Sequence, residues 1–348
     1  MQLRLSRHRP LLAQVLALAL SVVVDTASGA TITVPGQAGS LEAAIAATGA
    51  GDTILVGPGT YRGPENRKVW VESDRAIIAT HGPQQTIVDC ESVEEGFAFF
   101  PGVTSESCLD GFTIQNARYY GQGSAVYLLG ASPVIRNCII TENVGYGAPL
   151  YITSGGQPEI LGCVFSNNVS TYFGGGIFCL STPNPIIRNC LFINNSALRA
   201  GGLYCNYSAP TVENCTFYGN RSDFDAGHVQ LGFNSPARFE SCILAFSASG
   251  PAVSGMNGVF TCCDIFGNPG GDWTPNIATQ LGVQGNFTAD PLFCDELLGD
   301  LSLVSSSPCL PGNHPDGATC GLIGVFDQGC PTVPVEGVSW GGVKSLFR

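Results

Sequence analysis

The sequence predicts an all-β fold, a single-stranded right-handed parallel β-helix of roughly 25 residues per coil with a short N-terminal capping helix. Two observations predict this class. Short strand patterns recur at that spacing through the middle of the chain, and Asn or Gly recurs at fixed positions between them. Composition agrees: Gly is 45 of the 348 residues and only 12% of residues are charged, which is typical of short strands joined by tight turns.

Internal repeats carry most of the prediction. Each copy reads as a strand pattern, a cysteine, a second strand pattern and an asparagine, as in PTVENCTFYGN. The copies begin at Pro133, Pro158, Pro185 and Pro210, with looser ones at Arg238 and Phe260. The shared cysteines are Cys138, Cys163, Cys190, Cys215, Cys242 and Cys263, separated by 25, 27, 25, 27 and 21 residues. Each copy therefore supplies one coil, which pairs in parallel with its neighbours at about 4.8 Å.

Alternation within a copy assigns its faces, because successive side chains of a strand point to opposite sides. We expect Cys215 and Phe217 to point into the core, and Glu213 and Thr216 to point outward. The bend between the two strands falls at Asn214.

Asparagine and glycine mark the corners of the coil. Asn137 and Asn189 share the bend position of Asn214, and Gly162 replaces them in one copy. Both residue types tolerate the left-handed backbone, so this exchange predicts a left-handed turn. A second column marks the next corner, where stacked amides can hydrogen bond along the solenoid; it comprises Asn143, Asn168, Asn195, Asn220 and Asn268.

Twelve of the fifteen cysteines fall into two groups. Those of the repeat column, with Cys179 and Cys205, are expected to be reduced thiols that fill the core, because parallel Cβ vectors fit a disulfide poorly. Cys294, Cys309, Cys320 and Cys330 lie in irregular sequence, where we expect a local disulfide pair. No CxxC pair or nearby His accompanies the column, so we expect no metal site and no cofactor.

The N-terminus reads as an export signal. Arg4, Arg7 and Arg9 precede an apolar run over 11–24, and small residues over 28–30 offer a cleavage site. This layout is typical of a secretory signal peptide; a membrane anchor is the alternative, but the run is shorter than the roughly 20 residues that a bilayer span needs. We expect no transmembrane segment after cleavage.

The remaining chain divides by pattern. The expected parts are a signal peptide (1–30), a cap helix beginning after Ser40 and a first strand (31–60), the β-helix (61–293), a cysteine-containing C-terminal cap (294–330) and a tail (331–348). A formal net charge of −12 excludes a nucleic-acid partner, because phosphates would be repelled. We expect a monomer.

These residues resemble the pectin-lyase-like superfamily of right-handed β-helices over nearly all of 31–293. GDTILVGPGTY follows the predicted helix, and the FxxN (from Phe165, Phe192 and Phe217) and GGxI/L motifs (from Gly175 and Gly201) look like repeats of polymorphic outer-membrane proteins. The C-terminal tail is similar to those of secreted bacterial β-helix proteins. The resemblance implies a bacterial protein that is secreted or displayed on the cell surface.

Enzymes of this superfamily cut acidic polysaccharides, but their motifs are missing. Polygalacturonase-like hydrolases of the superfamily carry motifs resembling NTD, DD, GHG and RIK. This sequence has no NTD or DD, and Gly227-His228 is followed by Val instead of Gly. Nor do we find the Arg base and clustered acidic Ca²⁺ ligands of pectate-lyase-like enzymes. A polysaccharide lyase or glycoside hydrolase therefore remains the second hypothesis.

The candidate site is a row of outward loops between each FxxN motif and the next strand. The proposed ligand-binding residues are Tyr119, Tyr120, Tyr146, Tyr172, Phe173 and Arg199. Aromatic faces with a few polar neighbours suit sugar rings, and a row of ordinary solvated turns is the alternative. Asp223, Asp225 and His228 are the weaker candidates for an acid/base site, since alternation from Val229 turns His228 outward.

Two functions follow. The first is a non-catalytic extracellular or cell-surface β-helix that presents a carbohydrate- or partner-binding edge, with a polysaccharide or a cell-surface molecule as partner. The second is an enzyme acting on acidic polysaccharide.

Overall fold

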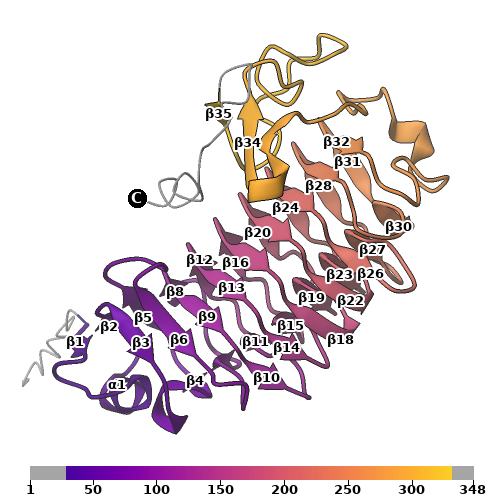
Figure 1. The fold of residues 1–348 in the computed structure, drawn as a ribbon. Helices are drawn as coiled ribbons and strands as arrows, with labels where there is room; N and C mark the ends of the chain where they lie inside the picture. The colour runs from indigo at the N-terminus through magenta and orange to yellow at the C-terminus, as the bar shows by residue number, and fades with distance from the viewer. Residues whose placement is uncertain (1–28, 331–348) are drawn as a thin grey trace, which may run out of the picture.

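The computed structural model describes residues 29–330, which form an elongated stack of parallel β-coils (Figure 1). Short strands of successive coils lie side by side, and α1 (Leu41–Ala47) is the one α-helix of the described chain. The prediction of an all-β solenoid with a short N-terminal helix is confirmed. The signal peptide, apart from residues 29 and 30, and the tail 331–348 lie outside the described residues and stay predictions.

Three long parallel sheets form the walls of the solenoid. Sheet A has ten strands: β1 (Thr31–Val34), β2 (Asp52–Val56), β5 (Arg75–Ala79), β8 (Cys108–Asp110), β12 (Val134–Arg136), β16 (Glu159–Leu161), β20 (Ile186–Arg188), β24 (Thr211–Glu213), β28 (Arg238–Glu240) and β31 (Val259–Thr261). Sheet B has nine: β3 (Gly59–Tyr61), β6 (Thr86–Asp89), β9 (Thr113–Gln115), β13 (Ile139–Thr141), β17 (Val164–Ser166), β21 (Leu191–Ile193), β25 (Thr216–Tyr218), β29 (Ile243–Ala245) and β32 (Asp264–Phe266). Sheet C has eight: β4 (Val69–Val71), β7 (Phe97–Phe99), β11 (Val126–Leu129), β15 (Leu150–Thr153), β19 (Ile177–Leu180), β23 (Leu203–Asn206), β27 (Val229–Leu231) and β30 (Val253–Gly255).

Two smaller sheets complete the described fold. Sheet D lies at the corner between sheets B and C and comprises β10 (Arg118–Tyr119), β14 (Val144–Gly145), β18 (Val169–Phe173), β22 (Ser196–Arg199) and β26 (Arg221–Ser222). Sheet E comprises β33 (Phe293–Asp295), β34 (Asp300–Val304) and β35 (Gln328–Cys330). Short 3₁₀ turns occur at η1 (Pro64–Asn66), η2 (Ala278–Gln280) and η3 (Glu296–Leu298).

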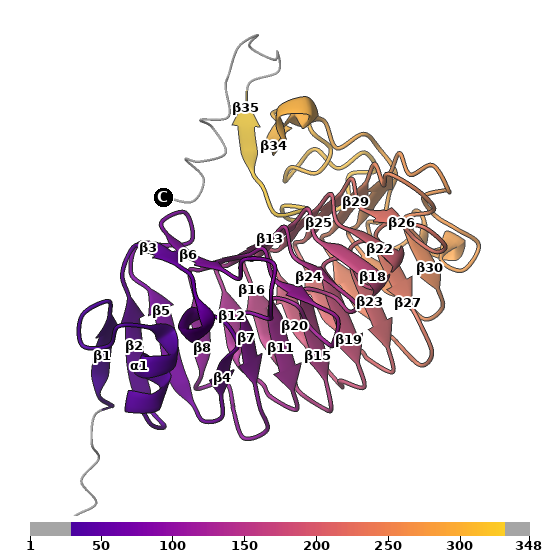
Figure 2. The ribbon, with the colours of Figure 1, turned by 60° about the horizontal axis from the view of Figure 1, so that its bottom comes forward.

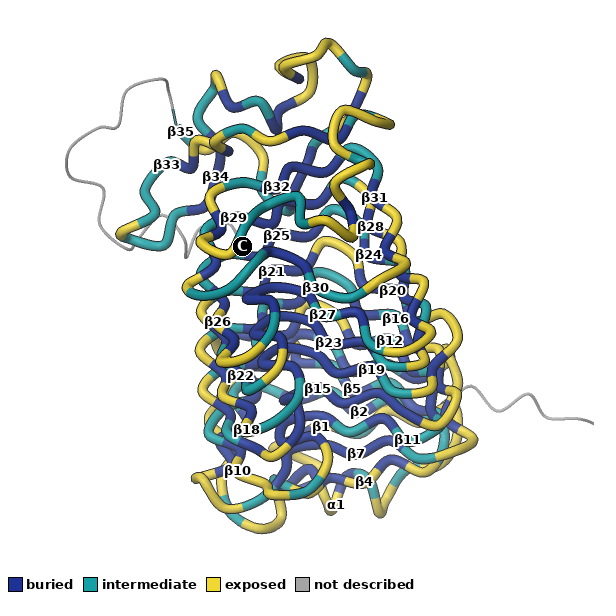
Figure 3. Tube along the Cα trace, turned by 90° about the vertical axis from the view of Figure 1, so that its right-hand side faces the viewer, coloured by how far each residue is buried: buried dark blue, intermediate teal, exposed yellow. Residues whose placement is uncertain are grey.

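The core is a set of side-chain columns along the axis, and burial is concentrated on the inner side of every coil (Figure 3). Phe192 stacks on Phe165 at 5.0 Å between ring centroids and on Phe217 at 4.4 Å. Cys215 and Phe217 point inward as expected, and both are fully buried. Strand pairing in register therefore converts the repeat period into continuous columns of like residues.

The corners follow the predicted asparagine positions. Asn137, Gly162, Asn189 and Asn214 have φ values of 53°, 60°, 54° and 48°, so the left-handed bend is confirmed. In the second column, three buried Asn side-chain amides donate to the side-chain oxygen of the next coil's Asn. These N–O distances are 3.0, 2.9 and 3.0 Å for Asn143–Asn168, Asn168–Asn195 and Asn195–Asn220.

The N-terminal end is closed by α1. Ser40 caps the helix by accepting a hydrogen bond from the Ala43 amide at 3.2 Å, and Leu41 and Ala44 are buried in the core. The helix contacts β4, the first strand of sheet C, and so covers the core where no further coil pairs with it. One strand, β1, precedes the helix, whereas the sequence placed the first strand after it.

The C-terminal segment takes a different path from the one expected. Ile277 and Trp273 pack against the core at its last coil, so the end is closed by residues that precede 294–330. The later segment runs back along the outer face of sheet B (Figure 2), where Leu301, Leu303 and Ile323 pack on a separate cluster.

This path corrects the expectation that Thr216 is exposed. Its side chain is 1% exposed because the returning segment covers it, and its Oγ1 accepts a hydrogen bond from the Val325 amide at 3.0 Å. Glu213, on the uncovered face of sheet A, does point outward and pairs with Arg188.

The cysteines divide largely as expected. All six of the repeat column, with Cys179 and Cys205, are free and buried. Cys294 pairs with Cys330, which is the expected local disulfide, whereas Cys320 pairs with Cys262 of the last coil. Cys309 is free and buried.

Candidate functional site

The predicted loops form one continuous edge, sheet D. β18, β22 and β26 pair in parallel, so that Val169, Ser196 and Arg221 share one register. In each of these strands the second residue is buried and the residues on either side of it are not, as for Ser170 between Val169 and Thr171. Outward side chains of three successive coils therefore meet on one exposed face.

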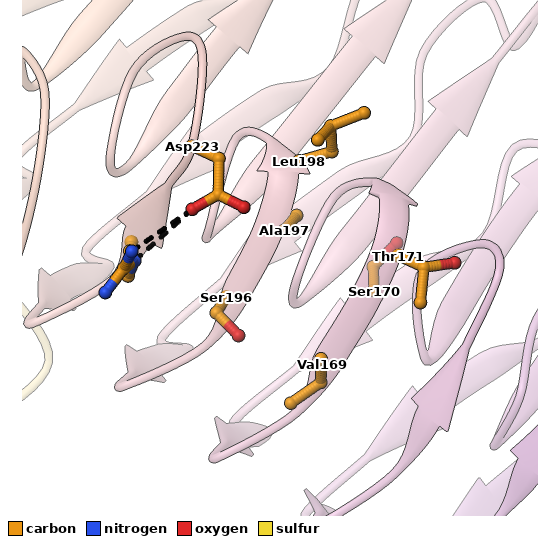
Figure 4. Close-up of a pocket in the computed structure, with 8 residues that line it drawn as sticks. Val169, Ser170, Thr171, Ser196, Ala197, Leu198 and Asp223 are labelled. Atoms are coloured by element: carbon orange, nitrogen blue, oxygen red, sulfur yellow. Dashed lines mark hydrogen bonds and ion pairs between the residues drawn. The ribbon is translucent and has the colours of Figure 1, made fainter.

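A shallow groove of about 490 Å³ lies on this face (Figure 4). Its lining residues are Val169, Ser170, Thr171, Ser196, Ala197, Leu198, Arg221 and Asp223. Hydroxyl groups and a charged pair thus stand beside small apolar side chains. Of these, only Asp223 is a site residue predicted from the sequence. Counting from the Asn column, which each of them follows directly, would have aligned Val169, Ser196 and Arg221.

The carboxylates of the edge are each paired with an arginine. Asp223 accepts from Arg221 at 3.3 Å, and Asp225 accepts from Arg199 at 3.0 Å. The Arg221 and Asp223 side chains are 63% and 52% exposed, and such solvated pairs contribute little to stability. Arg221 and Asp223 can therefore exchange their mutual contact for a ligand's polar groups at small cost.

His228 does not join these carboxylates, which corrects its predicted outward orientation. Its side chain is fully buried. Gly176 and Gly202 occupy the same position in the preceding coils, and a Cβ there would meet the rings of Phe192 and Phe217 at 2.7 and 2.8 Å. This position therefore points into the core, and Leu244 in place of Phe in the next coil leaves room for an imidazole.

The second asparagine column (Asn143 to Asn268), whose side chains form a hydrogen-bonded ladder, is interrupted once. The His228 ring continues the ladder at that coil. Ser247 replaces Asn in the coil after Asn220, and the Asn220 amide lies 3.2 Å from His228 Nδ1 instead. His228 Nε2 lies 3.1 Å from the Ala245 carbonyl oxygen, which fixes Nε2 as the donor. Burial lowers the pKa of His228 to about 3, so its role is structural.

The aromatic residues of the edge have different surroundings. Tyr119, Tyr120 and Tyr146 are 38%, 67% and 48% exposed. Tyr146 stacks on Tyr172 with ring centroids 5.2 Å apart, so these two rings form one platform. The Tyr120 hydroxyl accepts from Arg118 at 2.9 Å.

Phe173 belongs to the wall rather than to the open edge. Its ring stacks on Tyr204 at 4.9 Å and lies 5.0 Å from Phe178. Tyr151, Phe178 and Tyr204 form an aromatic row on the outer face of sheet C that the loops cover. Sequence reasoning missed this row, although the repeated patterns LYI, IFC and LYC carry an aromatic at the outward position.

A second hollow, of about 330 Å³, lies toward the N-terminal end. It is lined by Trp70, Glu95, Ala98, Phe100, Tyr119, Gly121, Gln122 and Tyr127. Tyr119 is the one predicted site residue in this lining.

Within residues 29–330, no three His, Cys, Asp or Glu side chains gather closely enough to hold a metal ion. Over the same range, no helix is both long and apolar enough to cross a bilayer.

Comparison with known proteins agrees with the geometry. The family model described as "Right handed beta helix region" matches residues 101–287. A search of curated proteins finds no match. The matched stretch contains the asparagine ladder, the cysteine column and all five strands of sheet D. The chain belongs to the right-handed beta-helix family.

Proposed function

We propose that the protein is an exported, non-catalytic β-helix that binds carbohydrate at the sheet D edge, outside a bacterial cell or on its surface. The observation that carries this proposal is the groove across β18, β22 and β26, where Thr171, Leu198 and Asp223 line one side. A sugar presents hydroxyl groups on its rim and C–H groups on its faces. Paired guanidinium and carboxylate groups beside apolar side chains complement both.

Because the coils repeat, equivalent side chains of sheet D form rows that run along the solenoid axis. Equivalent side chains recur at the strand spacing of about 4.8 Å, which is close to the size of a sugar ring. An extended glycan would therefore lie across several coils, with Tyr146 and Tyr172 as a stacking platform at the end of β18. Tyr119 and Tyr120 continue the exposed aromatic surface toward the N-terminus.

The surroundings of the acidic residues give less support to the enzyme hypothesis. General acid/base catalysis needs a group that exchanges protons with substrate. His228 is buried in the ladder, and Asp223 and Asp225 are held by Arg221 and Arg199. Binding is the function that this arrangement favours.

The test compares two ion pairs on different faces. Arg221→Met with Asp223→Asn removes the pair in the groove, and Arg188→Met with Glu213→Gln removes an arginine–carboxylate pair from the outer face of sheet A. A glycan array identifies ligands of the wild type, and calorimetry then measures binding to all three proteins. We expect the dissociation constant to rise at least tenfold for the groove variant and to stay within twofold for the control.

Two outcomes would contradict this assignment. If both variants bound the array ligand like the wild type, the binding site would lie elsewhere on the protein. If the wild type bound no acidic or neutral glycan, the proposal of carbohydrate binding would be wrong. Release of reducing ends or unsaturated products by the wild type, lost on Asp223→Asn, would favour the hydrolase or lyase hypothesis instead.

A further inference from the structure

We propose that the hollow beside Trp70 is a second binding site, specific for an organic ammonium group such as that of an amino sugar. It is separate from the sheet D groove, since the two share no lining residue. The proposal rests on a buried carboxylate without a partner, on the aromatic rings around it, and on the charges nearby.

Glu95 is the first observation. It is 8% exposed and lines the hollow. Its Oε2 atom is buried and accepts no hydrogen bond from the protein. An uncompensated buried carboxylate oxygen is costly, and native proteins satisfy such groups. A ligand that donates hydrogen bonds and carries positive charge would supply what the protein does not.

Nearby cations are engaged elsewhere. Arg67 Nη1 bonds Glu91 at 2.5 Å, and Arg67 Nε lies 3.5 Å from Glu94. Lys68 Nζ lies 3.7 Å from Glu94. The two basic side chains thus pair with Glu91 and Glu94, and within residues 29–330 Glu95 forms no ion pair.

The other unsatisfied groups belong to residues of adjoining coils. Within residues 29–330, Arg67 Nε, Glu95 Oε2 and Ser124 Oγ are the three buried side-chain atoms without a hydrogen-bond partner. The Lys68 amide donates to the Glu95 carbonyl, and the Gly96 amide donates to the Ser124 carbonyl. The residues that carry these atoms therefore lie on adjoining coils.

Aromatic rings make the hollow suitable for a cation. Trp70, Phe100, Tyr119 and Tyr127 contribute four rings, and Trp70 meets Phe100 edge-on at 5.5 Å. Ring faces attract ammonium groups, most strongly for Trp. Lys68 Nζ already lies 5.8 Å from the centre of the Trp70 ring, which shows that an ammonium is accommodated at this indole.

The remaining contacts fix the shape of the hollow. Tyr127 donates its hydroxyl proton to Gln122 Oε1 at 3.0 Å, which holds both side chains at the rim. A Cβ at Gly121 would lie 2.3 Å from the Tyr119 ring, so glycine permits this ring to lie against the loop. A volume of about 330 Å³ is at the small end of ligand pockets and suits one sugar unit.

The experiment uses the full chain and small cations as probes. Binding of glucosamine and of methylammonium is measured by NMR titration, with N-acetylglucosamine as the neutral control of similar shape. We expect the wild type to bind both cations and to bind N-acetylglucosamine at least tenfold more weakly. Binding of glucosamine alone would assign the site to amino sugars, whereas binding of both assigns it to ammonium groups in general.

Two variants locate the site. Glu95→Gln keeps the shape of the side chain and removes its charge, and we expect it to weaken cation binding at least tenfold. Glu106→Gln removes the same charge from an exposed side chain that does not line the hollow, and we expect a change below threefold. Thermal unfolding of both variants checks that the fold is intact.

The proposal is overturned if the wild type binds neither cation, or if Glu106→Gln and Glu95→Gln weaken binding equally. Because Arg221→Met with Asp223→Asn leaves this hollow untouched, its effect on glycan binding reports on the groove alone. Failure of one site is thus distinguishable from failure of the other.

Discussion

His228 supplies the hydrogen-bond partner that is missing where Ser247 replaces Asn in the second asparagine column. The asparagine ladder passes its hydrogen bond from coil to coil, and Ser247 cannot pass it on because its side chain is too short. Imidazole Nδ1 takes the place of the missing amide oxygen, and Nε2 donates to the Ala245 carbonyl. A neutral ring satisfies both contacts, whereas a protonated ring would direct an N–H at the Asn220 amide, which is itself a donor.

This arrangement makes His228 a pH-dependent contributor to stability. Its pKa is lowered to about 3 by burial, from about 6.5 in an unfolded chain. The unfolded state therefore binds more protons between these values, and the stabilising contribution, present above pH 6.5, is lost as pH falls toward 3. We expect a loss of about 2 kcal/mol between pH 6.5 and 5 from this residue.

A variant that restores the repeat isolates the effect. His228→Gly, Ser247→Asn and Leu244→Phe together copy the neighbouring coils, where Phe217 packs over Gly202 and Asn continues the ladder. Urea unfolding at pH 5 and 6.5 measures both proteins. The stability difference between wild type and variant should shift by about 2 kcal/mol against the wild type at pH 5; an unchanged difference would contradict the assignment.

At the scale of elements, the returning C-terminal segment explains what the repeat pattern could not predict. Alternation correctly placed Phe217 inside and Glu213 outside, because both depend on their own coil. Thr216 is buried by Val325, which is 109 residues away, and no local pattern records that contact. His228 was misplaced because alternation was extended from Val229 into a turn; the glycines at 176 and 202 were the signal that this position faces inward.

Asp264 lies beneath the same segment. It is fully buried on β32, where it accepts from the Ala289 amide at 3.1 Å and from the Cys309 thiol at 3.4 Å. Burial raises its pKa to about 8, so the folded protein holds this carboxyl protonated at neutral pH. Its stabilising contribution is fully present below the unfolded pKa near 3.9 and is lost as pH rises toward 8.

Asp264→Asn should therefore make the fold less sensitive to alkali. We expect the variant to gain about 2 kcal/mol relative to wild type between pH 6 and 7.5, because an amide keeps the acceptor for Ala289 and cannot ionise. Urea unfolding at the two pH values measures this. Hydrogen exchange of residues 289–310 should rise with pH in the wild type and not in the variant; equal pH dependence in both would refute the role of this carboxyl.

At the scale of the whole molecule, the solenoid is a set of coils that contact mainly their neighbours, closed at both ends. Such a fold frays from an open end, because a terminal coil has one interface instead of two. α1 covers one end, and Trp273 and Ile277 cover the other. The sequence predicted the period, the columns and the N-terminal closure because these are periodic or adjacent features. Which outer faces stay open, and hence where the two hollows lie, depended on side chains of separate coils.

The free cysteines report on this cooperativity without any added label. The six column thiols run from Cys138 to Cys263 and are fully buried, whereas Cys108 is half-buried. Burial raises the pKa of the Cys138, Cys215 and Cys263 thiols, which further suppresses the reactive thiolate. In native protein we expect iodoacetamide to modify Cys108 first and the column much more slowly. Because both ends are capped, the column thiols should react at similar rates, set by opening of the whole stack. Mass spectrometry of timed digests resolves each site, and modification of Cys263 or Cys138 about tenfold faster than Cys190 would show that the coils open from an end instead.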